Sequence, residues 1–195
     1  MASTADQPYL IETGRLSLRL AEETDAPFIL ELLNDPGWIR FLGDRGVKSL
    51  EAAREYIHKL RGMYREHGFC LYVTELGKLH VPDPLPDGWL HPGLDRVPIG
   101  LCGLIKREHL ADVDIGFALM ERYWGRGLAF EAATGVMAYA RDVLGLSRLV
   151  AITSPENQPS ARLLTKLGMH DAGTIRPYGN DTEERLFVRE FDKCL

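Results

Sequence analysis

The chain has 195 residues, of which 45% are hydrophobic and 26% charged, so it can build one substantial core. Its 23 basic and 28 acidic residues leave a formal charge of -5, which argues against a general nucleic-acid-binding protein. No apolar run approaches the roughly 18 residues of a membrane span, and the N-terminus lacks the features of a secretory signal. Three cysteines without paired spacing argue against a disulfide framework or a zinc site. We therefore expect a cytoplasmic protein that binds neither membranes nor nucleic acid.

The first part of the chain predicts one strand, two helices and a second strand. Leucines alternate with polar residues in the second half of 10–20, which indicates a half-buried strand. A short helix is expected from a cap at Thr24 to Asn34, where Asp35-Pro36-Gly37 breaks it. Helical spacing of apolar residues predicts a second helix over 49–66, and 69–76 has the pattern of a strand.

Residues 77–97 are rich in proline and glycine, and we interpret them as a long loop inserted between two strands. Strands are then expected over 98–105 and 112–119, followed by a glycine-containing turn.

The last part of the chain alternates between helices and strands. A wide apolar stripe predicts a helix over 128–144, and 148–153 is a short buried strand. Pro159 suits the first position of another helix, capped by Gln158 and ending at Gly168. Two strands follow near 171–176 and 185–191. The order is β-α-α-β-β-β-α-β-α-β-β, which is a mixed α/β fold without internal repeats.

The strongest chemical signal is the strand, turn and helix from Asp114 to Ala129. Free N–H groups and the helix dipole at a helix start attract anions, and Gly125 and Gly127 allow the backbone to approach a phosphate closely. Arg122 and Arg126 add positive charge. A pyrophosphate fits such a site. The alternative is a plain strand-to-helix turn, in which glycine only permits a positive φ.

Two further positions carry candidate chemistry. Asn157-x-x-Ser160 offers an amide and a hydroxyl to a ligand, although such residues also cap helices. Asp114 is a carboxylate within an apolar strand and can act as a general base toward an amine. Its alternative interpretation is an outward-facing residue on a half-exposed strand. The histidines show no metal-ligand spacing, so no metal is expected.

Together these motifs resemble the GNAT superfamily of acyl-CoA N-acyltransferases, and within it the RimJ/RimL type of ribosomal-protein N-acetyltransferase. The resemblance covers about residues 10–192, as a single domain with the insert 77–97. It rests on several motifs in order: Leu16-Ser17-Leu18-Arg19 with Asp25, Asp114-Ile115-Gly116-Phe117, Tyr123 to Ala132 including Arg122-x-x-Gly125-x-Gly127, and Asn157-x-x-Ser160 through Met169.

The resemblance implies a central sheet whose middle strands splay apart, with acyl-CoA in the gap. Backbone around Leu119 and Met120 would pair with pantetheine and polarise the thioester carbonyl. The turn from Arg122 to Ala129 would hold the pyrophosphate. The cofactor-binding candidates are therefore Leu119, Met120, Arg122, Gly125, Arg126, Gly127, Leu128, Ala129 and Asn157.

Two departures from the family pattern concern the acid and the acceptor. Many relatives have a Tyr three residues before the Leu-Gly pair, to protonate the leaving thiolate; here that residue is Leu164. Ser160 or solvent can take this role, which makes Asp114 and Ser160 the catalytic candidates. The segment 77–97 is also longer than the family's usual hairpin turn, and we expect it to shape acceptor access.

We therefore expect an N-acetyltransferase that transfers an acetyl group from acetyl-CoA to a primary amine, preferably a protein N-terminal α-amine. Two alternatives stay open: an acetyltransferase of small amines such as antibiotics or polyamines, and a non-catalytic acyl-CoA sensor with the same fold. Monomer and homodimer are both compatible with the sequence.

Overall fold

A computed structural model describes residues 9–77, 80, 96–177 and 182–191. In this part of the chain eight strands form a single sheet. The strands are β1 (Ile11–Glu12), β2 (Leu16–Arg19), β3 (Leu71–Gly77), β4 (Arg96–Ile105), β5 (Val113–Leu119), β6 (Arg148–Thr153), β7 (His170–Ile175) and β8 (Glu184–Glu190). The helices are α1 (Ala26–Asn34), α2 (Pro36–Leu42), α3 (Leu50–His67), α4 (Leu128–Asp142) and α5 (Gln158–Lys166), with short 3-10 turns η1 (Glu23–Asp25) and η3 (Glu121–Tyr123).

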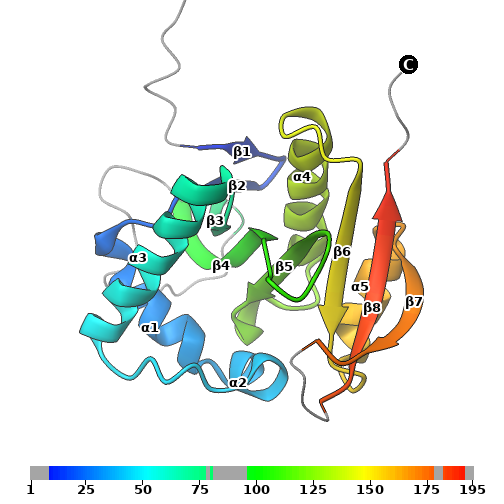
Figure 1. Cartoon of the computed structure of the whole chain (residues 1–195). Helices are drawn as coiled ribbons and strands as arrows, with labels where there is room; N and C mark the ends of the chain where they lie inside the picture. The colour runs from blue at the N-terminus through cyan, green and yellow to red at the C-terminus, as the bar shows by residue number, and fades with distance from the viewer. Residues whose placement is uncertain (1–8, 78–79, 81–95, 178–181, 192–195) are drawn as a thin grey trace, which may run out of the picture.

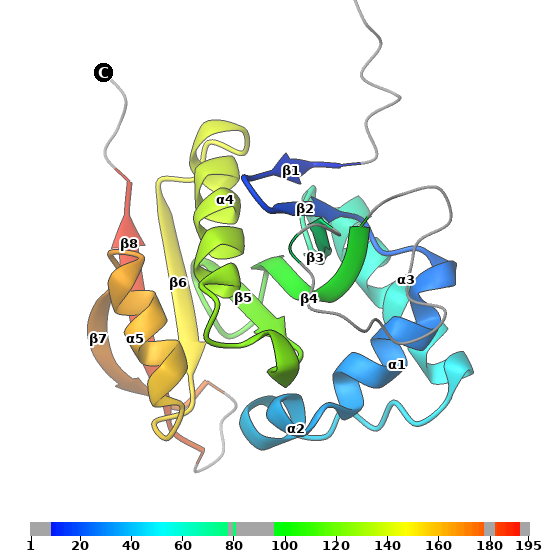
Figure 2. The ribbon, with the colours of Figure 1, turned by 180° about the vertical axis from the view of Figure 1, so that it is seen from behind.

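The strand order across the sheet is β1-β2-β3-β4-β5-β6-β8-β7. Neighbouring strands are antiparallel except β5 and β6, which are parallel and are connected through α4. Helices α1 and α3 cover one face of the sheet, and α4 and α5 cover the other (Figures 1 and 2). The predicted mixed α/β fold with flanking helices is therefore confirmed.

Helix α3 shows how local sequence produces an element. The Ser49 side chain accepts a hydrogen bond from the Ala52 N–H and caps the helix start. At the other end, Gly68 has φ 79°, the left-handed conformation that ends many helices. Between these ends, Ala53, Ile57 and Leu60 are buried against the core, as their helical spacing predicts.

Three local predictions in the first part of the chain are wrong. The strand expected in the second half of 10–20 is present as β2, but it is fully buried and not half-buried, because Ser17 and Arg19 are as inaccessible as the leucines between them. The short strand β1 before it was not expected; the chain folds back at Thr13, whose N–H donates to the Leu16 carbonyl.

The N-cap of α1 is Asp25 and not Thr24, because the chain first forms the 3-10 turn η1 and Thr24 lies inside that turn. The Asp25 carboxylate accepts the Glu22 N–H and so closes a capping box at the start of η1.

The third error is at Asp35-Pro36-Gly37, which ends α1 as expected but also begins α2. The Asp35 side chain accepts a hydrogen bond from the Gly37 N–H, and Pro36 occupies the first position of the new helix. Most of the predicted insert, residues 78–79 and 81–95, lies outside the described residues. Its last two residues belong to β4, which begins at Arg96 rather than at residue 98.

A buried ion cluster joins β2, η1 and β3. Both outer nitrogens of the Arg19 guanidinium donate to Asp25, at 2.8 Å each, and its Nε donates to Glu75 at 2.9 Å. The three side chains are at most 4% exposed. Burial alone would lower the pKa of Arg19, but the bonds to Asp25 and Glu75 outweigh it and raise that pKa. Arg19 therefore stays charged and connects β2 to β3 and to the turn η1 that precedes α1.

We predict that Asp25→Asn destabilises the fold by about 1–3 kcal/mol, because it breaks a buried bidentate pair and leaves an Arg19 N–H without its acceptor, although Glu75 still balances the Arg19 charge. Equilibrium denaturation measures the loss. The control is Lys48→Gln, which removes the exposed Lys48–Asp44 pair and should leave the unfolding midpoint almost unchanged. Equal effects of the two variants would contradict the role assigned to the cluster.

Candidate functional site

The centre of the candidate site is a gap between β5 and β6. Among the described residues, these two strands pair only at Val113–Leu149 and Asp114–Val150, and then they diverge. Burial changes at the same point. Asp114 and Ile115 are buried, whereas Gly116, Phe117 and Ala118 are half-exposed although β5 is a central strand. The two strands therefore splay apart, as the resemblance implied, and in the described part of the chain one edge of β5 has no strand partner beyond Asp114.

Backbone geometry decides which groups of β5 face this gap. The Met120 N–H donates to the Ile99 carbonyl of β4 at 3.0 Å, and the Met120 carbonyl accepts from the Tyr123 N–H. Hydrogen-bonding directions alternate along an antiparallel ladder, so the N–H groups of Phe117 and Leu119 point the other way, toward β6. The Leu119 carbonyl already accepts the Trp124 indole N–H at 2.7 Å. Of the two residues expected to pair with pantetheine, Leu119 has its N–H directed at the gap, and Met120 is engaged within the fold.

The turn after β5 has the geometry of an anion site. Gly125 and Gly127 both have φ 73°, a conformation that side-chain-bearing residues rarely adopt. Gly127 is the N-cap of α4 and brings no side-chain cap, so the first-turn amides, including those of Leu128 and Ala129, stay available. The buried Leu128 side chain anchors this turn to the core. The glycines are thus required by the backbone, and the site they create also suits a phosphate.

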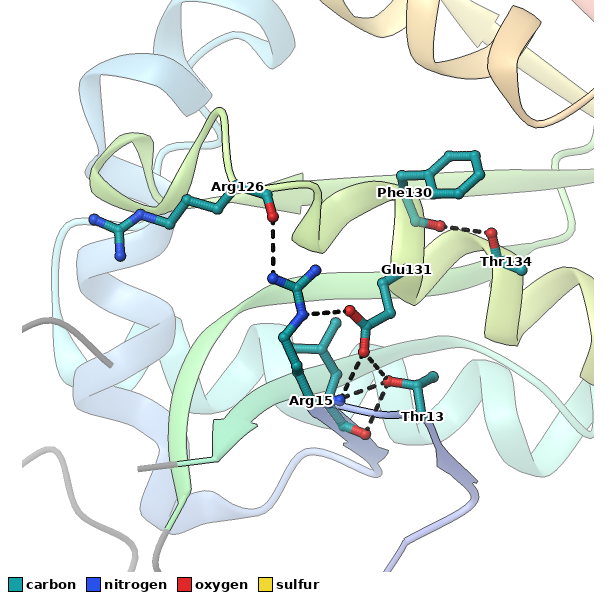
Figure 3. A network of polar contacts seen from close by, with 7 residues as sticks. Thr13, Arg15, Arg126, Phe130, Glu131 and Thr134 are labelled. Carbon is teal, nitrogen blue, oxygen red and sulfur yellow. Dashed lines mark hydrogen bonds and ion pairs between the residues drawn. The ribbon is translucent and has the colours of Figure 1, made fainter. Parts of the chain in front are cut away.

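The two arginines of the turn lie in different surroundings. Arg122 forms an ion pair with Glu31 of α1 at 2.8 Å, and its guanidinium lies over the Tyr123 ring. Arg126 is exposed, and its side chain extends outward from the turn (Figure 3). Arg122 therefore links the turn to α1, and Arg126 presents its charge to solvent beside the helix start.

A polar network that sequence reasoning missed supports this turn (Figure 3). Arg15, just before β2, forms an ion pair with Glu131 of α4 at 2.7 Å and donates to the Arg126 carbonyl at 3.1 Å. Glu131 also accepts from the Thr13 hydroxyl. Arg15 and Glu131 are 116 residues apart, and each alone has the pattern of a solvated charge. The only sign of this network in the sequence was Glu131, an acidic residue in the first turn of a helix, where the helix dipole favours negative charge.

Asp114 is buried at the closed end of the gap. Its side chain is 2% exposed, which rules out the outward-facing interpretation. One carboxylate oxygen accepts from the Arg107 Nε at 2.6 Å, and among the described residues the other has no hydrogen-bond partner. Burial raises the pKa of Asp114 to about 6, although the nearby Arg107 acts in the opposite direction. A carboxylate in this state can accept a proton near neutral pH.

Two charged residues around Asp114 were not found from the sequence. Arg107 comes from the connection between β4 and β5, and Glu184 begins β8. Burial raises the pKa of Glu184, one of whose oxygens is buried without a partner in the described part of the chain. The negative charge of Glu184 raises the pKa of Asp114, and the Arg107 cation lowers the pKa values of both carboxyls. The base candidate thus lies between opposing charges from two separate segments.

Helix α5 gives the second polar motif its geometry. The Asn157 side chain caps this helix by accepting the Ser160 N–H at 3.1 Å, so the predicted Gln158 cap is wrong. Capping occupies only the side-chain oxygen of Asn157, and the Ser160 side chain is half-buried. Leu164 is 1% exposed and belongs to the core, and its side chain has no proton to donate.

Other kinds of site find little support in the described part of the chain. No group of three histidine, cysteine or acidic side chains there is arranged to hold a metal ion. Burial raises the pKa of the Cys70 thiol to about 12, and the Cys102 pKa is also raised, which makes both poor nucleophiles. None of the described helices combines the length and the apolarity that a membrane crossing requires.

Several known proteins are similar to this chain in sequence or in fold. The chain is 27% identical over 169 residues to an uncharacterized N-acetyltransferase, YoaA of Bacillus subtilis, and the match covers 87% of each protein. An acetyltransferase structure from Agrobacterium tumefaciens shares the fold, with a TM-score of 0.72, 22% identity, and coverage of 98% of this chain and 99% of that one.

The RimL ribosomal L7/L12 α-N-protein acetyltransferase, solved in complex with coenzyme A, also shares the fold, with a TM-score of 0.71 and 19% identity, covering 92% and 96% of the two chains. Residues 15–170 match the family model described as the acetyltransferase (GNAT) domain, which spans most of the sequence. The chain therefore belongs to the GNAT acetyltransferase family.

Proposed function

We propose that this acetyltransferase transfers an acetyl group from acetyl-CoA to a protein N-terminal α-amine, with Asp114 as the base. Family membership supports the reaction type and the co-substrate. The observation that carries the choice of acceptor is the buried carboxylate of Asp114, whose pKa is about 6. An α-amine has a pKa of about 8 and is partly neutral at pH 7, so a weak base suffices; a lysine amine, near 10.4, needs more help.

Different groups of the chain would bind the co-substrate, stabilise the intermediate and transfer protons in this reaction. The turn from Arg122 to Ala129 would hold the pyrophosphate, and the β5 amides of Phe117 and Leu119 would orient the pantetheine arm. A backbone donor at the thioester carbonyl would stabilise the oxyanion of the tetrahedral intermediate. Asp114 would take the proton of the attacking amine, directly or through water. With Leu164 in the core, Ser160 or solvent would return a proton to the leaving thiolate.

The acceptor is tested by measuring free-thiol release from acetyl-CoA with peptides, polyamines and aminoglycosides. The proposal expects peptides with a free N-terminus to be the best acceptors and N-terminally blocked peptides containing lysine to be poor. Preference for a polyamine or an aminoglycoside would identify a small-molecule acetyltransferase instead. Absence of thiol release with every amine, in a protein that binds acetyl-CoA, would identify a sensor.

Gly127→Glu is expected to abolish acetyl-CoA binding, because the new side chain brings both positive-φ strain and negative charge to the proposed phosphate turn. Calorimetry should give the wild type a micromolar affinity, about -8 kcal/mol. Gly145→Glu is the matched control, because Gly145 also has a positive φ and is exposed, but it follows the far end of α4. Normal binding by folded Gly127→Glu protein would refute the placement.

Asp114→Asn should lower turnover by about 10²-fold or more, with little change in the KM for acetyl-CoA. In the wild type, activity should fall as pH decreases through about 6, because the carboxylate must be deprotonated to accept a proton. The variant should lack this limb near pH 6 and keep only the fall in rate that protonation of the acceptor amine, with a pKa of about 8, causes. A pH–rate profile with one peptide acceptor measures both effects.

Substitution of either charged residue beside Asp114 should move the acidic limb of the pH–rate profile in a predictable direction. Arg107→Gln removes a cation beside Asp114 and should move the acidic limb to higher pH. Glu184→Gln removes a negative charge and should move it to lower pH. If neither variant moves the limb, a group other than Asp114 titrates there.

Asn157 is predicted to contribute separately to capping and to acetyl-CoA binding. Asn157→Asp keeps an oxygen that can cap α5 but removes the amide N–H donors, so the melting temperature should hold while the KM for acetyl-CoA rises. Asn157→Ala should also lose about 1 kcal/mol of stability with the cap. If the kinetics of Asn157→Asp are normal, the residue acts as a cap alone.

A further inference from the structure

The Arg15 side chain connects the start of β2 with the turn that precedes α4. Its Nε bonds to Glu131 at 2.7 Å, and one of its outer nitrogens donates to the Arg126 carbonyl at 3.1 Å (Figure 3). The backbone N–H of Arg15 also donates to Glu131, at 2.7 Å. Arg15 thus contacts both the first turn of α4 and the peptide group just before Gly127.

This contact fixes the orientation of one peptide group. In a planar trans peptide the carbonyl and the following N–H point in opposite directions. Because the Arg126 carbonyl points at Arg15, the Gly127 N–H points away from it. Gly127 forms one side of this peptide and Gly125 comes directly before Arg126, and glycine permits many other backbone orientations. An external hydrogen bond is therefore needed to hold the amide in one direction.

Glu131 in turn holds Arg15. One of its carboxylate oxygens accepts from the Thr13 hydroxyl at 2.6 Å and from the Arg15 N–H, and the other accepts from the Arg15 Nε. Burial raises the pKa of Glu131, but these bonds outweigh burial and bring that pKa below its ordinary value. The carboxylate is therefore charged at neutral pH and neutralises much of the Arg15 charge.

We propose that Arg15 is a positioning residue for acetyl-CoA: held by Glu131, it presets the Arg126–Gly127 peptide so that the amides at the start of α4 converge on the pyrophosphate. The inference rests on the proposed placement of the pyrophosphate at this turn. Since Arg15 acts through the backbone and its charge is matched, loss of either Arg15 or Glu131 has the same consequence. A direct phosphate ligand would behave differently, because removing Glu131 would strengthen it.

The test compares Arg15→Ala, Glu131→Gln and the double variant in steady-state kinetics. Each single variant should raise the KM for acetyl-CoA by about tenfold with little change in kcat, and the double variant should be no worse than the poorer single one. With S-acetylpantetheine, which lacks the pyrophosphate, all variants should match the wild type in kcat/KM. Arg141→Ala is the control, because it removes an exposed ion pair near the far end of α4.

Four outcomes would overturn the proposal. If Glu131→Gln lowers the KM for acetyl-CoA while Arg15→Ala raises it, Arg15 is a phosphate ligand. If the variants lose acetyl-CoA and S-acetylpantetheine turnover equally, the network only supports the fold. An unchanged KM in Arg15→Ala removes the role outright while the proposed function stands, whereas failure of the wild type to use acetyl-CoA removes both.

Discussion

Pairing between β5 and β6 stops after Asp114 and Val150, and the proposed site depends on this divergence. The backbone N–H and C=O groups of a central strand normally form hydrogen bonds with both neighbouring strands. Here β4 pairs with one edge of β5 from Asp114 to Leu119, and among the described residues no strand pairs with the other edge beyond Asp114. The gap therefore offers hydrogen-bonding groups in an extended geometry, which suits an extended ligand arm with amide groups.

The main core includes residues from both halves of the sheet, and each half also has stabilising contacts of its own. On one side, β2, β3 and β4 pack with the helices in the main core, and the Arg19 cluster connects them to the start of α1. On the other side, β6 is paired with β8 over its full length, and a smaller apolar cluster forms around Leu110, Val150 and Val188. The strands of each half are thus hydrogen-bonded to neighbours within that half, without further pairing between β5 and β6.

Local rules predicted the elements well and the contacts between them poorly. The apolar stripes of α3 and α4 and the strong pattern of β4 and β5 appear in the structure close to where the sequence places them. The errors at Thr24 and Gln158 are shifts of one residue, because several neighbouring polar residues can cap a helix and only the folded backbone selects one. Pro36 was interpreted as a breaker, although the same fixed φ also starts a helix.

The sequence indicated those features of the candidate site whose residues lie within one segment of the chain. The turn with Gly125 and Gly127 is local, and the structure gives both glycines the expected backbone. The pairs Arg15–Glu131 and Arg107–Asp114, and the approach of Glu184, depend on which strands become neighbours. Charge alone does not encode these partners, since each residue also fits a solvated surface. The burial of Asp114 was likewise open, because strand alternation gives a face but not what covers it.

The buried carboxylate of Asp114 has a consequence for the stability of the protein as a function of pH. Its pKa is about 6 in the folded chain and 3.8 in an ordinary setting, so the folded state binds a proton more tightly than the unfolded state. The stabilising effect of that proton is complete below pH 3.8 and is lost as pH rises through 6. At the pH where the ionised carboxylate would serve as a base, it opposes folding. The group that is the candidate base therefore lowers the stability of the folded protein when it is charged. Evolution toward greater stability would favour its replacement.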